Sequence, residues 1–244
     1  MDSFESQLRS KVISLAIFSV AMGFLEAMVV VYLRQIYYPE GFSFPLKAMS
    51  ARAVSFESLR EISTITMLVS VGMIAGRNRL ERMACILYCF GIWDIFYYAW
   101  LKVLLNWPPT LFTWDILFLI PVVWAGPVLA PVICSLSMVM IALSIWMSQR
   151  KGQIVKLHPL EWVLLSLGSL LIFLSFVWEY GRLVVQGGFL PRFLSLGSDP
   201  LFQKVNASHT PGAFNWTFFL LGEGCVLVSV VLLWKRMIRL KSSS

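Results

Sequence analysis

The stretch that decides the fold runs from residue 91 to residue 131 and reads Gly91-Ile-Trp-Asp94-Ile-Phe-Tyr97-Tyr98-Ala-Trp-Leu-Lys102-Val-Leu-Leu-Asn-Trp-Pro-Pro-Thr-Leu-Phe-Thr-Trp114-Asp115-Ile-Leu-Phe-Leu-Ile-Pro-Val-Val-Trp-Ala-Gly-Pro-Val-Leu-Ala-Pro131. The triplet Trp-Asp-Ile occurs twice, at 93–95 and 114–116, inside segments as apolar as lipid. A carboxylate is costly in such surroundings and usually has a function there. Asp94 and Asp115 are therefore the best candidates for a functional centre.

The rest of the chain has the same apolar character. Its 244 residues are 58% hydrophobic and 14% charged, and the mean hydropathy is +0.76. Soluble domains carry about 25% charged residues, and a bilayer is crossed by about 20 apolar residues in a helix. We therefore expect an all-α fold, a polytopic membrane helix bundle that forms a single integral membrane domain over residues 1–244.

Apolar runs predict six spanning helices, at about residues 11–33, 55–76, 83–105, 128–147, 160–180 and 214–234. Residues 111–125 precede the fourth span, and prolines and a glycine interrupt the chain from Pro121 to Pro131. We expect this segment to be one re-entrant or interfacial half-helix. A full seventh span would place a basic cluster on the opposite side of the membrane.

Basic residues predict the orientation. With six spans, twelve of the twenty Lys and Arg fall in four short segments on one side: Arg9, Lys11, Arg77, Arg79, Arg82, Arg150, Lys151, Lys156, Lys235, Arg236, Arg239 and Lys241. The positive-inside rule places that side, with both termini, in the cytoplasm. Longer connections, near residues 34–54, 106–125 and 182–213, then lie outside.

Several functions are disfavoured by composition. The net charge of +7 does not indicate nucleic-acid binding, because the basic residues sit at the ends of apolar runs. No Cys or His has metal-ligand spacing, and no phosphate-binding loop or hydrolase nucleophile motif occurs. We expect no cofactor and no bound metal. An oxygen-only divalent site made by Glu26, Asp94 and Asp115 stays an open alternative.

The candidate polar site gathers carboxylates from six segments in the outer half of the membrane, where a helical rise of about 1.5 Å per residue places them. They are Glu26, Glu61, Asp94, Asp115, Glu179 and Glu223. Other expected members are Tyr97, Tyr98, Lys102, Trp114 and Arg182, with Arg34, Arg60 and His209 as further candidate cations.

Within this set we expect two specific contacts. Asp94 and Asp115 should approach each other, flanked by Tyr97 or Tyr98, Lys102 and Trp114, and form a polar cavity that opens outward. The reason is that the Pro-Pro turn after the third span folds the second Trp-Asp-Ile triplet back toward the first. Glu179 and Arg182, three residues apart on one helix, should form an ion pair.

At its paired Trp-Asp-Ile triplets the chain resembles bacterial multi-spanning inner-membrane proteins of uncharacterised activity, over about residues 91–131. The resemblance implies a bacterial inner (plasma) membrane and no particular activity. Three functional classes therefore stay open. The favoured one is an accessory or assembly protein; the alternatives are a transporter or proton-coupled permease, and a membrane enzyme acting on lipid-linked or small apolar substrates. The expected partners are the lipid bilayer, a lipid or small-molecule ligand, and a partner membrane protein.

Overall fold

The fold is described from a computed structural model that covers residues 2–120, 122–149, 156–191 and 199–242. Pro121, Arg150 and Lys151 lie outside the described residues. Within them the helices are α1 (Asp2–Tyr37), α2 (Ala51–Ala75), α3 (Arg79–Leu105), α4 (Leu129–Gln149), α5 (Pro159–Gln186), α6 (Pro200–Asn206) and α7 (Trp216–Ser242), and the strands are β1 (Trp114–Phe118) and β2 (Trp124–Pro127).

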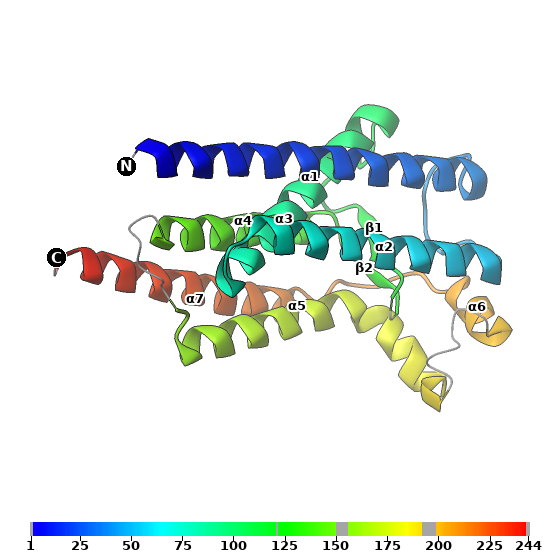
Figure 1. The fold of residues 1–244 in the computed structure, drawn as a ribbon. Coiled ribbons are helices and arrows are strands. Elements are labelled where there is room, and N and C mark those ends of the chain that lie inside the picture. Colours follow the sequence, from blue (N-terminus) through cyan, green and yellow to red (C-terminus); the bar gives the residue numbers. More distant parts are fainter. Residues whose placement is uncertain (1, 121, 150–155, 192–198, 243–244) are drawn as a thin grey trace.

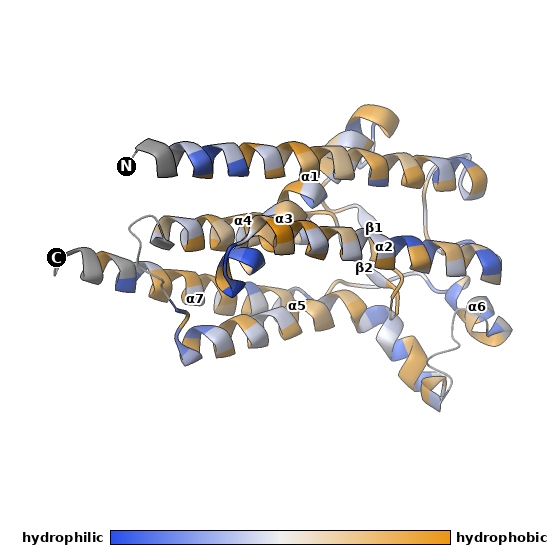
Figure 2. Ribbon diagram, viewed as in Figure 1, coloured by the Kyte–Doolittle hydropathy of each residue, from blue (hydrophilic) through white to orange (hydrophobic). Residues whose placement is uncertain are grey.

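Six of these helices, all but α6, are long and apolar enough to cross a membrane. Each overlaps one of the six expected spans, so the prediction of a helical, multi-pass membrane bundle is confirmed. Apolar residues run along all the long helices, while hydrophilic ones gather at the beginning of α2 and at the turn between α2 and α3 (Figure 2).

Local signals explain where the central helix α3 begins and ends. The side chain of Asn78 accepts a hydrogen bond from the N–H of Glu81 at 3.0 Å, which caps the first turn. Asn106 ends the helix in the left-handed conformation, with φ of 51°, a region that Asn adopts more readily than most residues. Asp94 is thereby held near the middle of a helix of 27 residues.

The bundle is organised around α3, which packs against α1, α2 and α4, whereas α7 packs against α4 and α5. The long helices lie alongside one another, and both termini lie at the same end of the bundle, with α6 at the opposite end (Figure 1). We call this opposite end the α6 end. The main core cluster joins α1, α3 and α4, and a second cluster packs the segment after α3 against α5 and α6.

The half-helix expected at residues 111–125 is wrong, because the described part of this segment contributes to an antiparallel β-hairpin of β1 and β2. Its residues include many aromatic and β-branched side chains, which favour strands. Non-helical backbone is tolerated deep in a membrane protein where it is enclosed by protein or lines a cavity. Asp115 lies opposite Gly126 in the hairpin register, and a Cβ on Gly126 would lie 2.9 Å from Phe214.

Candidate functional site

A cavity of about 640 Å³ lies between α1, α2, α3, the hairpin and the segment around α6. This volume falls in the range of ligand pockets. Five carboxylates and three cations line the cavity among the described residues, and they are Glu26, Glu57, Glu61, Asp94, Asp115, Arg34, Lys47 and Arg60. Apolar and aromatic side chains make up most of the remaining wall. The cavity therefore has the mixed lining of a site for an amphiphilic molecule.

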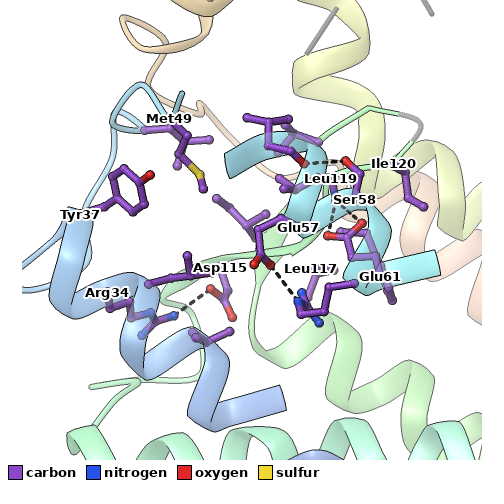
Figure 3. A pocket seen from close by; sticks show the side chains of 18 of the residues that line it. Arg34, Tyr37, Met49, Glu57, Ser58, Glu61, Asp115, Leu117, Leu119 and Ile120 are labelled. Carbon is purple, nitrogen blue, oxygen red and sulfur yellow. Dashed lines mark hydrogen bonds and ion pairs between the residues drawn. The ribbon is translucent and has the colours of Figure 1, made fainter. Parts of the chain in front are cut away.

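Asp115 is the most enclosed charged group of this cavity. Its Oδ1 is 3.1 Å from Nη2 of Arg34 (Figure 3). The Tyr97 hydroxyl lies 3.5 Å from Oδ2. Burial raises the pKa of Asp115 to about 6, and the Arg34 guanidinium partly offsets that increase. The pair connects α1 with the hairpin, because Arg34 belongs to α1 and Asp115 to β1.

Asp94 has a neutral partner. The Ser135 hydroxyl of α4 donates a hydrogen bond of 2.7 Å to Asp94 Oδ2. In the part of the chain that the structure describes, no cation forms an ion pair with Asp94. Both Trp-Asp-Ile aspartates thus line one cavity, one with an arginine and the other with a serine.

Arg60 bridges the two helices on either side of the cavity. Its Nη1 lies 2.7 Å from Glu26 of α1, and its Nε lies 2.8 Å from Glu57 on its own helix α2. Glu26 was predicted as a member of the site and Arg60 as a candidate cation, whereas Glu57 was not predicted. The contact between Arg60 and Glu26, which are 34 positions apart, was not predicted either.

Glu61 holds the hairpin against α2. Its two carboxylate oxygens accept the backbone N–H of Leu119, at 2.9 and 3.0 Å (Figure 3). This N–H lies just after β1, where it has no ladder partner. Glu61 therefore has an evident structural role in addition to lining the cavity.

Several residues predicted to belong to the site do not line the cavity. Lys102 donates to the carbonyl oxygens of Asn106 and Pro108 at the end of its own helix and does not line the cavity. Trp114 packs edge-on against Phe44 and Phe214, also outside the cavity lining. The prediction that Lys102 and Trp114 flank the two aspartates is wrong. Lys102 instead finds its acceptors at the end of α3, and Trp114 packs among aromatic rings.

Two further members of the predicted site, Tyr98 and Glu223, also lie outside the cavity lining. Tyr98 is buried against Tyr97, with ring centroids 4.9 Å apart, but is not a lining residue. Glu223 of α7 accepts a 2.6 Å hydrogen bond from Ser137 of α4, apart from the cavity. Ser135 and Ser137 were not predicted as partners of these carboxylates, because serine is common in membrane helices and gives no periodic signal.

The Glu179–Arg182 ion pair is not formed within the described residues. Glu179 instead accepts the backbone N–H of Gly212 at 3.1 Å and lies 3.5 Å from Nε2 of His209. The connection before α7 thus folds onto the end of α5 and supplies the partners, which a local offset of three residues cannot predict.

No group of three or more His, Cys, Asp or Glu side chains that could hold a metal ion is found in the described ranges. Comparisons with protein-family models, curated proteins and solved structures found no match.

Proposed function

We propose that this multi-pass protein resides in a bacterial inner membrane, with both termini in the cytoplasm, and binds a small amphiphilic ligand in the cavity. The orientation is supported by the clustering of basic residues at the same end of the bundle as the termini. The cavity then lies in the outer half of the membrane.

The observation that carries this proposal is the cavity itself, with about 640 Å³ of space and a lining that is both apolar and charged. Burying carboxylates and guanidinium groups in a membrane protein is costly. A role that rested on helix packing alone would need no such space, so the geometry favours a ligand-binding role over an accessory role of that kind. The apolar walls suit the hydrocarbon part of a ligand, and the charged groups suit its polar part.

Two serines of α2 allow a matched test of the cavity. Ser58 lines the cavity, whereas Ser63 is exposed on the same helix, and each hydroxyl donates to the carbonyl oxygen four residues earlier. Ser58→Trp should fill part of the cavity and abolish binding, and Ser63→Trp should not. The measurement is native mass spectrometry of amphiphiles that stay with the purified protein. Equal ligand content in wild type and Ser58→Trp would contradict the proposed function.

The orientation has its own test. A single cysteine at Lys204, which is exposed at the α6 end, should react with a membrane-impermeant maleimide in intact cells. A cysteine at Gly152, a position outside the described residues, should react only after the cells are opened. Labelling of the Gly152 cysteine in intact cells would overturn the proposed topology.

A further inference from the structure

Arg34 lines the cavity and has an unused hydrogen-bond donor. The residue is only 8% exposed, and Nη1 is buried without a hydrogen-bond partner, whereas Nη2 holds Asp115. The guanidinium lies over the Trp107 ring at 3.8 Å and over the Phe42 ring at 4.7 Å from the centroids. These contacts fix the orientation of the group. A buried guanidinium with a free N–H is a prepared partner for an oxyanion, which takes up such donors in a planar arrangement.

Asp94 is the complementary pole of the same cavity. It accepts one hydrogen bond from Ser135 and has no ion-pair partner among the described residues. The cavity lining as a whole carries five carboxylates against three cations. A bound group with a positive charge would offset this excess and satisfy the remaining acceptor capacity of Asp94.

We propose that the ligand is a zwitterion, whose oxyanion binds Arg34 and whose ammonium group binds Asp94. This inference rests on the proposed function and specifies its ligand. Asp115 connects the two poles, since it contacts Arg34 and also Tyr97, which lies about one helical turn from Asp94.

This chemistry has two sources, a phospholipid head group such as phosphoethanolamine and a free zwitterion such as an amino acid. We would measure binding to the full-length protein in an uncharged maltoside detergent with three probes. Lysophosphatidylethanolamine has both charges, lysophosphatidylglycerol of the same acyl chain has only the phosphate, and leucine is the free zwitterion. Binding of the first probe in preference to lysophosphatidylglycerol identifies a lipid source, and tight binding of leucine identifies a free one. Either result supports the inference.

Substitutions test the two poles of the cavity, Arg34 and Asp94, one at a time. Wild type should bind a zwitterion at least about tenfold more tightly than lysophosphatidylglycerol, because a charge-assisted hydrogen bond is lost with the ammonium group. Asp94→Asn keeps an acceptor for Ser135 and should remove this preference. The double variant R34Q/D115N removes both members of the buried pair, leaves no unpaired charge, and should weaken binding of both lipid probes. Glu223→Gln, which changes a buried carboxyl outside the cavity, is the control and should keep the preference.

Two negative results have different meanings. If both lysolipids bind equally well to wild type and Ser58→Trp abolishes both, the cavity binds amphiphiles but the zwitterion inference is overturned. If no probe binds and Ser58→Trp behaves as wild type, the proposed function itself fails.

Discussion

Arg34 Nη2 lies 3.1 Å from Asp115 Oδ1, so a pair separated by 81 positions in the sequence attaches the hairpin to the first helix. The two side chains are only 9% and 3% exposed. Burying two charges costs free energy of desolvation, and removing only one of them costs more, because the other is then buried without a partner. The contact therefore couples the position of the hairpin to the charge balance of the cavity.

The first prediction concerns this coupling. Arg34→Gln alone should lower the free energy of unfolding by about 3 kcal/mol or more, because it leaves Asp115 buried without its cation. R34Q/D115N should recover much of that loss. The measurement is a double-mutant cycle by thermal unfolding in detergent. Additive losses in the double variant would show that the pair contributes little.

The second prediction is a pH dependence. Because burial raises the pKa of Asp115 from 3.8 to about 6, the folded protein binds this proton more tightly than the unfolded chain does. The contribution of Asp115 to stability is therefore greatest below about pH 4, falls as the pH rises through about 6, and is constant at higher pH. The Tm of Asp115→Asn minus the Tm of wild type should increase over that interval and then level off, because only wild type loses this contribution. A decrease of this signed difference with rising pH would contradict the assignment.

The third prediction tests the attachment of the hairpin to α2. Glu61→Leu should leave the Leu119 N–H without its acceptor, at a cost of about 1–3 kcal/mol. Glu61→Gln keeps a carbonyl acceptor and should be milder. Limited proteolysis within residues 111–128 should accelerate in the first variant only. Equal cleavage of the two variants would show that this hydrogen bond does not hold the segment.

The fourth prediction uses two glycines of α7. A Cβ on Gly222 would lie 2.8 Å from the Gly168 carbonyl oxygen and 2.7 Å from Ile172, whereas a Cβ on Gly224 meets nothing within 4 Å. Gly222→Ala should therefore separate α5 and α7 and lower Tm by several degrees. Gly224→Ala should be neutral or slightly stabilising, since Ala favours helix. Equal Tm values for the two variants would indicate that the close approach is not needed.

Much of the fold could be predicted from sequence, because the bilayer imposes a simple rule on helix length. Apolar runs of about 20 residues predict the spans, and such runs can be recognised without any knowledge of tertiary contacts. The same rule singles out Asp94, since a carboxylate near the middle of an apolar helix stands out whatever surrounds it. The Trp-Asp-Ile triplet pointed to Asp115 as well.

The hairpin is where sequence reasoning failed. In a short apolar segment with prolines, the pattern of apolar residues is too short to distinguish a half-helix from two strands. The choice depends on neighbours, such as the carboxylate of Glu61, which accepts the Leu119 N–H, and Phe214, which leaves no room for a side chain at Gly126. Both lie far from the hairpin in sequence.

The sequence by itself determined that the chain has six apolar segments long enough to cross a membrane and that carboxylates occur among them, because hydropathy depends on residue type alone. Only the tertiary structure decided the partner of each charge: Arg34 for Asp115, Ser135 for Asp94, Arg60 for Glu26, and Gly212 and His209 for Glu179. The reason is that a hydrogen bond or ion pair depends on distances of about 3 Å between side chains. Helix packing and the path of the connecting segments set these distances.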